Sequence, residues 1–239
     1  MNFIYLLFII SLTSSCFSLQ EKTFGTPEQA DQLANKIIKA THQEYWKNTK
    51  VIQWTFSMGK RSHIWDRERE LEYVKWDEYE VWLNLTTKKG IVKKEGELVE
   101  GTDKQVYLDK AWSYWINDSF WLNPIAKFYD EGVSRRLVSI KGDTALNISY
   151  SKGGLTPGDS YLWLINNEGL PTAWKLWVSI IPINGFRFSW ENWQKTNSGV
   201  MIATKHHNIL SNVNIDNVKG ENSIKALFGN IDPFLPLIK

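Results

Sequence analysis

The stretch YLWLINNEGLPTAWKLWVSI, residues 161–180, decides how this chain folds. Two apolar runs flank a turn made of amide, acidic, glycine and proline residues, which is the pattern of a β-hairpin. Successive side chains of a strand point to opposite faces, so Trp174 and Leu176 share one face while Lys175 lies on the other. The stretch therefore predicts two antiparallel strands that are rich in large aromatic side chains.

Runs of the same kind recur along most of the chain. They fall within residues 51–94 and 133–218, with tight turns such as Gly59–Lys60 between them. Their spacing is that of a meander, in which each strand pairs with the next. The sequence therefore predicts about ten or eleven strands in a single curved antiparallel sheet.

An N-terminal helix is predicted to cover this sheet. Thr26 is a good N-cap, Pro27 suits the first helical position, and Gln29 completes a capping box with Thr26. The apolar side chains that follow have the three-and-four spacing of one buried stripe: Ala30, Leu33, Ala34, Ile37 and Ile38. A helix with one such stripe needs a large apolar surface to pack against.

A second, short helix is predicted inside an aromatic insert at residues 108–130. We expect Asn117 or Asp118 to end it, ahead of Pro124. The sequence shows no internal repeat or linker that would divide the chain. The expected class is therefore mainly β with helices (α+β), with one domain over residues 19–239.

A signal peptide is predicted at residues 1–18. The apolar run Phe3–Leu12 has the length of a signal-peptide core, and no charged side chain accompanies it. The stretch LTSSC resembles a lipobox that would lead to lipidation of Cys16, the only cysteine; ordinary cleavage after Ser18 is the alternative. Both routes predict an exported protein of a bacterial cell envelope. It would lie in the periplasm or be anchored to the outer membrane through Cys16.

The composition limits the classes of partner that we expect this protein to bind. The formal net charge of +2 is too small to indicate a nucleic-acid partner. The aromatic content is high, with 13 Trp, 11 Phe and 9 Tyr among 239 residues. A Trp side chain is the largest apolar group available to a core or to the wall of a hydrophobic site. The rings are therefore expected either to fill an ordinary core or to line a space for an apolar ligand.

The hairpin also carries a family resemblance. The stretch INNEGLPTAWKL, residues 165–176, follows a leader, an amphipathic helix and a series of strands, and in that setting it resembles the LolA/LolB-like proteins. The stretches HIWDR (63–67), WINDSFWL (115–122) and LTPGDSYLW (155–163) look like segments of an uncharacterised bacterial branch of that family. The resemblance implies an incomplete antiparallel β-barrel with helices over its open side and an apolar cavity between. It also implies a carrier or receptor for lipoproteins or lipids.

The leading hypothesis is a non-enzymatic envelope protein, without a cofactor, that holds an acyl chain, a lipid or a lipidated protein in such a cavity. Burying an acyl chain yields about 0.8 kcal/mol per CH₂. Strand alternation selects the candidate wall residues: Trp54, Phe56, Trp82, Trp163, Trp174, Phe186, Phe188 and Trp190. The alternative is an envelope scaffold or interaction lipoprotein whose core is filled by these rings.

Signals for catalysis or metal binding are weak. The sequence contains none of the patterns G-x-S-x-G, G-x-x-x-x-G-K-[ST] and G-x-G-x-x-G. His206 and His207 are neighbours on a predicted strand and point to opposite faces, so together they predict no metal site. The charged residues 63–72 are interpreted as a solvated hairpin edge, and Asp159 as a turn residue. A hydrolase or isomerase that uses the barrel pocket is the third hypothesis.

Overall fold

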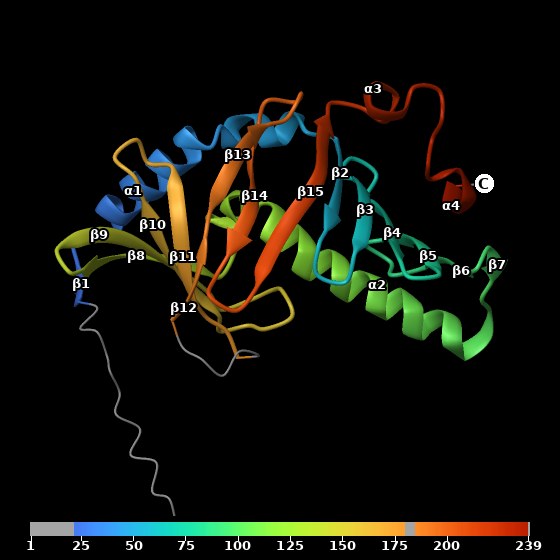
Figure 1. Ribbon diagram of the computed structural model, residues 1–239, viewed down its shortest axis with the longest axis horizontal. Coiled ribbons are helices and arrows are strands. Elements are labelled where there is room, and N and C mark those ends of the chain that lie inside the picture. Colours follow the sequence, from blue (N-terminus) through green and yellow to red (C-terminus); the bar gives the residue numbers. More distant parts are fainter. Residues whose placement is uncertain (1–21, 180–184, 239) are drawn as a thin grey trace, which may run out of the picture.

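The computed structural model describes residues 22–179 and 185–238 (Figure 1). The predicted signal peptide, residues 1–18, and the predicted lipidation site Cys16 lie outside the described residues. Within them the chain is mainly β with helices, which confirms the predicted class. The strands hydrogen-bond in two antiparallel sheets.

The first sheet has six strands in the spatial order β1-β8-β9-β10-β11-β12. They are β1 (Lys22–Phe24), β8 (Val133–Ile140), β9 (Asp143–Tyr150), β10 (Ser160–Ile165), β11 (Pro171–Trp177) and β12 (Phe186–Ser189). The quoted hairpin is the pair β10 and β11, in which Trp163 lies opposite Trp174. Its predicted strands and turn are therefore confirmed.

The second sheet has nine strands in the spatial order β13-β14-β15-β2-β3-β4-β5-β6-β7. Four of them come late or at an edge: β13 (Glu191–Lys195), β14 (Met201–His207), β15 (Asn212–Glu221) and β7 (Glu97–Leu98). The others form a meander: β2 (Val51–Phe56), β3 (Arg61–Asp66), β4 (Leu71–Trp76), β5 (Tyr79–Asn84) and β6 (Gly90–Lys94). The described strands exceed the ten or eleven predicted because short pieces such as β1 and β7 add to the edges.

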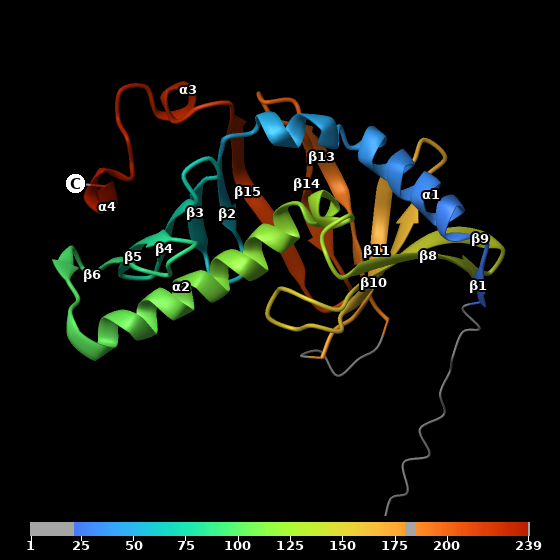
Figure 2. The ribbon, with the colours of Figure 1, turned by 180° about the vertical axis from the view of Figure 1, so that it is seen from behind.

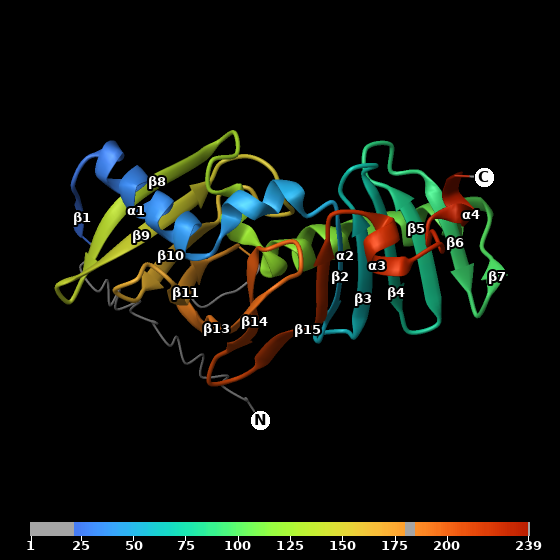
Figure 3. The same cartoon turned by 90° about the horizontal axis from the view of Figure 1, so that it is seen from above.

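The two sheets meet at Trp190. β12 ends at Ser189 and β13 begins at Glu191, so the chain passes from one sheet to the other through this residue. The Trp190 backbone N–H donates to the carbonyl of Thr172 in β11 at 2.8 Å, whereas β13 pairs with β14. The prediction of a single sheet is therefore wrong, because the strands divide into two sheets at this residue. Figure 3 shows β8 of the first sheet and β7 of the second at opposite ends of the molecule.

The helix α1 (Pro27–Ala40) begins as the sequence predicts. The Thr26 hydroxyl accepts the N–H of Gln29, and the Gln29 side chain accepts the N–H of Thr26, which completes the capping box. Its apolar stripe is buried and packs against β8 and β9. The 3₁₀ helix η1 (Gln43–Asn48) follows and leads into β2.

The helix α2 (Gly101–Leu122) is much longer than the short helix predicted inside residues 108–130. Its first turns are polar and exposed, so apolar spacing did not reveal them. Asp118 lies inside the helix and is buried, so the predicted end at Asn117 or Asp118 is wrong. α2 contacts β4, β5, β6 and β14, and Figure 2 shows it crossing one face of the strands. Among the described helices, none combines the length and apolar character that spanning a membrane requires.

The main core lies where α1 and the second half of α2 pack against both sheets. Trp163, Trp174 and Trp190 form its centre, with ring centroids 4.9–5.2 Å apart. A separate cluster joins the first half of α2 to β4, β5 and β6. Such contacts between large rings stabilise the fold beyond the area they bury.

A C-terminal segment with α3 (Ile224–Phe228) and α4 (Leu235–Ile238) covers the other face of β4, β5 and β6. Phe234 is buried there against Trp82, whose indole N–H donates to the carbonyl of Pro233 at 2.9 Å. The guanidinium of Arg69 donates to both carboxylate oxygens of Asp232, at 2.7 and 3.0 Å. Both faces of these strands are therefore covered, one by α2 and the other by the C-terminal segment.

Candidate functional site: an aromatic groove beside helix α2

A groove of about 900 Å³ lies beside the second half of α2. Its lining comes from η1, from β3 and the turn after it, from α2, and from the 3₁₀ helix η2 (Pro124–Lys127). The start of β8, the end of β9 and the loop between β9 and β10 complete it. These distant segments meet because α2 passes from one sheet toward the other (Figure 2).

Six aromatic side chains line the groove: Trp46, Trp65, Trp115, Phe120, Tyr150 and Tyr161. Trp65 packs edge-on against Trp46 and Trp115, with ring centroids 6.2 and 5.2 Å apart. These three indoles come from η1, β3 and α2, so they link three elements along one side of the groove. Because each ring has few torsions and is held by its neighbour, the wall is stiff.

The other side of the groove is also apolar. Phe120 packs on Tyr150 and Tyr161, with ring centroids 5.5 and 5.0 Å away, and the two tyrosine rings lie 5.8 Å from each other. Ile116 on α2 and Leu155 on the β9–β10 loop add aliphatic surface. Burial raises the pKa of both tyrosines well above its usual range, so their hydroxyls stay neutral.

Charged side chains lie at the rim. Lys127 pairs with Asp130 at 3.5 Å, and Lys152 pairs with Glu131. Asp159 is buried at the end of the β9–β10 loop and accepts hydrogen bonds from two hydroxyl groups, which fits its prediction as a turn residue. Two of these carboxylates are therefore paired with lysines, and the third is held by hydroxyl groups.

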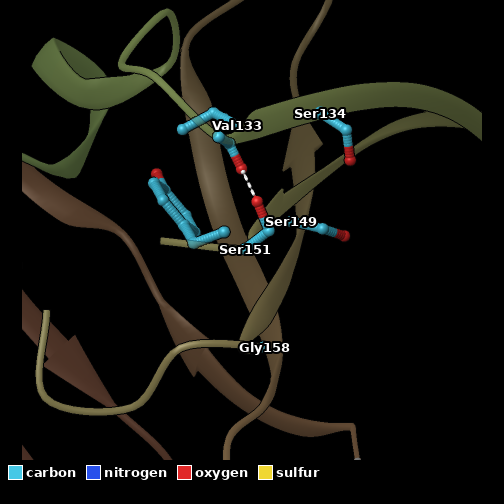
Figure 4. A pocket seen from close by; sticks show the side chains of 7 residues that line it. Val133, Ser134, Ser149, Ser151 and Gly158 are labelled. Atoms are coloured by element: carbon cyan, nitrogen blue, oxygen red, sulfur yellow. Dashed lines mark hydrogen bonds between the residues drawn. The ribbon is translucent and has the colours of Figure 1, made fainter. Parts of the chain in front are cut away.

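A second, smaller hollow of about 360 Å³ adjoins the groove at Val133 and Tyr150 (Figure 4). It is lined mainly by small residues of β8, β9 and the loop after β9. The Ser151 hydroxyl donates to the carbonyl of Gly132 at 2.8 Å, which ties the two strand ends together. The hollow carries no charged side chain, so it extends the groove without adding a reactive group.

A largely buried ionic network joins α2 to β3 and β4. Asp118 of α2 accepts hydrogen bonds from the guanidinium of Arg61 at 2.6 and 2.7 Å. His63 lies between two carboxylates, with Nδ1 2.7 Å from Glu72 and Nε2 2.9 Å from Asp118. Trp54 stacks on the His63 ring at 4.5 Å. The interpretation of residues 63–72 as a solvated hairpin edge is therefore wrong for its three buried ionisable members, His63, Asp66 and Glu72.

The protonation state of this network follows from burial and from its hydrogen bonds. Burial opposes charge on His63, but the hydrogen bonds to Asp118 and Glu72 outweigh it and raise its pKa. Burial raises the pKa of Glu72 to about 7. Burial acts the same way on Asp118, but the bonds from Arg61 and His63 prevail and lower its pKa. One proton shared by His63 and Glu72 keeps the cluster neutral, because Arg61 balances Asp118.

None of these four network residues lines the groove. Asp118, however, sits between Asn117 and Ser119, which do line it. The network therefore holds the α2 wall of the groove in place and does not face its interior. Most charged side chains of the groove lie at its rim; the exception is the buried Asp159, which accepts hydrogen bonds from the hydroxyls of Thr156 and Tyr161.

Most of the predicted wall residues fill the main core instead of lining an open cavity. Five of them are buried in one cluster with Phe188: Trp54, Phe56, Trp163, Trp174 and Trp190. Trp121 of α2 packs against Trp174 and Phe188, with ring centroids 5.0 Å away in both cases. α2 thus occupies the space in which the prediction placed a ligand. None of the predicted wall residues lines the groove.

The remaining two predicted wall residues also lie elsewhere. Phe186 is half-buried at the edge of the core and packs against Phe188 at 5.4 Å. Trp82 lies on the opposite face of its sheet, under Phe234. The error arose because neighbouring residues Val81 and Leu83 are also apolar and buried, so alternation did not identify the face.

The histidine pair behaves as predicted. His206 is buried against Trp190 at 4.3 Å, whereas His207 is exposed on the other face of β14. Burial lowers the pKa of His206 to about 4, so its ring is neutral. In the described part of the chain, no group of three or more His, Cys, Asp or Glu side chains is arranged to hold a metal ion.

The groove residues were missed, although a signal for them was present in the sequence. Three stretches quoted for the family resemblance meet at the groove: 63–67 supplies Trp65, 115–122 supplies Trp115 and Phe120, and 155–163 supplies Leu155 and Tyr161. Each stretch mixes aromatic residues with turn-forming or charged residues. This composition suits the wall of a groove better than the interior of a core.

Comparisons with known proteins add little to this geometry. No protein-family model and no curated protein match the chain. Among solved structures it is similar to a DUF1329 family protein from Desulfovibrio piger ATCC 29098, a crystal structure at 1.75 Å resolution. The identity is 10%, the match covers 86% of this chain and 98% of that chain, and the TM-score is 0.42. A likeness of this size transfers no property to this chain, and the resemblance to LolA/LolB-like proteins stays a prediction.

Proposed function

We propose that this chain is a non-enzymatic cell-envelope protein that binds an amphipathic, hydrophobic ligand in the groove beside α2. The ligand class is an acyl chain, a lipid or the lipid part of a lipidated protein. One observation carries the proposal: aromatic side chains from η1, β3, α2 and β10 converge on an open groove of about 900 Å³. That volume lies within the range of about 300–1,000 Å³ typical of small-molecule sites.

The chemistry of the groove favours an apolar chain over a polar metabolite. Its walls are rings and aliphatic groups, and most of its charges are paired at the rim. Burial of an acyl chain contributes about 0.8 kcal/mol per CH₂ before ordering costs. The stiff indole wall adds little entropy cost on binding.

The test measures uptake of a dansyl-labelled fatty acid by the purified protein. Emission from the probe on excitation of the groove tryptophans reports binding. Leu155→Asp places a charge on the groove wall at a loop residue that is 49% exposed, so the fold tolerates it. We expect this variant to lose most of the signal.

Ile209→Asp is the matched control. Ile209 is 92% exposed at the β14–β15 turn and does not line the groove, so its substitution should leave uptake unchanged. Equal uptake by both variants would place the probe outside the groove. No uptake by the unchanged protein would argue against ligand binding altogether.

The second candidate is an envelope scaffold that binds another protein through its surface. It is favoured by the solid main core, in which the predicted wall residues pack on one another and on α2. Native mass spectrometry separates the two candidates. A ligand-free protein with no uptake of fatty acid supports the scaffold, whereas co-purified lipid supports the carrier.

We also propose export and attachment to the outer membrane through Cys16. The support is the sequence alone, in the apolar leader and the stretch LTSSC. Radioactive palmitate should label the protein in bacterial cells and should not label Cys16→Ala. Labelling of neither, with cleavage after Ser18, would instead indicate simple secretion.

A further inference from the structure

One cation in the groove has no counterion, and it points to the chemistry of the ligand's head. Arg67 follows β3 directly and lines the groove. Its Nη1 donates to the carbonyls of Trp46 and Thr49, both at 2.5 Å. Its guanidinium carbon lies 3.9 Å from the centroid of the Trp46 ring and 5.3 Å from that of Trp65. The side chain is therefore held firmly in the groove lining.

The other partly buried arginines of the described chain all pair with a carboxylate. Arg61 binds Asp118, Arg69 binds Asp66 and Asp232, and Arg135 binds Asp31. Arg67 has no carboxylate within ion-pair distance among the described residues, and its Nε is buried without a hydrogen-bond partner. Two neutral carbonyls fix its position but leave its charge unbalanced.

This unbalanced charge is costly. Burial lowers the pKa of Arg67 to about 10, so the group is still cationic at neutral pH. The exposed carboxylate of Glu70, which also lines the groove, acts on Arg67 through space. A half-buried guanidinium gains most from an anion that shares its desolvated site and accepts two hydrogen bonds.

The other carboxylates that line the groove are held differently. Asp130 and Glu131 are already paired with lysines, the buried Asp159 accepts hydrogen bonds from hydroxyl groups, and Glu70 is exposed. Arg67 lies among indole rings. An apolar chain in the groove would therefore meet one buried positive charge without a bonded counterion, that of Arg67.

We propose that Arg67 is the head-group site of the groove and that it binds an oxyanion, a carboxylate or a phosphate, carried by the amphipathic ligand. This inference rests on the proposed function and specifies its ligand. The apolar tail then lies along Trp115, Ile116 and Phe120 of α2. Trp46 and Trp65 orient the guanidinium fork toward the oxyanion.

The test compares two probes with the same apolar chain: palmitic acid and the neutral alcohol hexadecanol. Calorimetric or displacement titration of the full protein gives both dissociation constants. We expect the acid to bind roughly 10- to 100-fold more tightly than the alcohol, the ratio expected for charge-assisted hydrogen bonds. Arg67→Gln should reduce the affinity for palmitic acid to the affinity for hexadecanol. It should leave the affinity for hexadecanol unchanged.

Two further variants complete the design. Arg67→Lys keeps the charge but loses the planar fork, so an intermediate preference is expected. Arg136→Gln removes an exposed arginine that does not line the groove, and should alter neither affinity. The unchanged affinity for the alcohol shows that Arg67→Gln has kept the groove intact.

Each remaining outcome counts against a defined part of the account. Equal binding of acid and alcohol by the unchanged protein, or equal weakening of both by Arg67→Gln, would overturn the head-group site while the groove stands. Binding of neither probe would overturn the proposed function as well. Inorganic phosphate is the third probe: binding at Arg67 as tight as that of palmitic acid would identify a free oxyanion as the ligand and contradict an amphipathic one.

Discussion

Nε2 of His63 lies 2.9 Å from Oδ2 of Asp118, and this contact joins β3 to α2 in the buried interior. Arg61 and Glu72 complete the connection from the same sheet. Buried charges cost free energy unless they are paired and hydrogen-bonded, and here nearly every partner is present. The position of α2, and with it one wall of the groove, therefore depends on this network.

Removing Asp118 should destabilise the fold strongly. Asp118→Ala leaves Arg61 and His63 without their shared anion, and breaking a buried pair in this way costs about 3–5 kcal/mol. The free energy of unfolding in urea measures the loss. Asp103→Ala, an exposed carboxylate in the first turn of the same helix, is the control and should change it by less than about 1 kcal/mol. A small loss for Asp118→Ala would show that α2 is held by packing alone.

Stability should fall as the pH rises from mildly acidic to mildly alkaline values. The folded-state pKa of Glu72, about 7, lies above its ordinary value, and that of His63 is also raised. A raised pKa contributes stability that is present in full below the unfolded value and is lost as the pH rises through the folded one. The free energy of unfolding should therefore drop between about pH 5 and pH 8, by up to about 1.4 kcal/mol per pH unit.

Glu72→Gln is the control for this pH dependence. The amide keeps the size of the side chain and its hydrogen bond to His63 but carries no titratable proton. The slope of unfolding free energy against pH should become shallower over the same range. If the slope of the unchanged protein is flat there, or if the variant leaves it unaltered, the shared proton is not held in the folded state.

Substitution of a central core ring should lower the free energy of unfolding. Trp174 is fully buried, so Trp174→Ala should cost about 3–5 kcal/mol. Phe186→Ala, at the half-buried edge of the same cluster, should cost clearly less. Urea unfolding followed by circular dichroism gives both values. Equal, small costs would mean that the core around Trp174 is open, as the sequence-based hypothesis of a cavity there required.

The C-terminal segment should detach when its buried ring is removed. Phe234→Ala eliminates the side chain that packs on Trp82. The partly exposed ion pair of Arg69 and Asp232 then contributes too little free energy to keep the segment attached. Limited proteolysis should then cut within residues 222–238 faster than in the unchanged protein. Leu235→Ala changes an exposed neighbour and should leave the cleavage rate as it is.

Local patterns predicted much of the fold. The capping box at Thr26 and the turn before Pro171 fix elements through neighbours in sequence, and both were identified correctly. The length of α2 was predicted wrongly, because its first turns present polar residues to solvent and lack an apolar stripe. The division of the sheet at Trp190 was also missed, since a bend in a strand leaves the alternation of its side chains largely intact.

The site was harder to predict because it depends on tertiary placement. Trp174 and Trp115 are both indoles in apolar surroundings, and only the path of α2 puts the first in the core and the second in the groove wall. Likewise, nothing local distinguishes His63 and Glu72 from surface charges, because their partner Asp118 is 55 residues from His63 in the chain.

Photochemical crosslinking with a fatty acid that carries a diazirine on its chain tests the groove most directly. After irradiation, the labelled peptides of the purified protein are mapped by mass spectrometry. The account predicts adducts concentrated in residues 115–120 of α2 and 155–161 of the β9–β10 loop and β10, and their loss when unlabelled palmitic acid competes. Adducts on the exposed turns alone, such as that of Ile209 and Leu210, or adducts that palmitic acid does not displace, would contradict it.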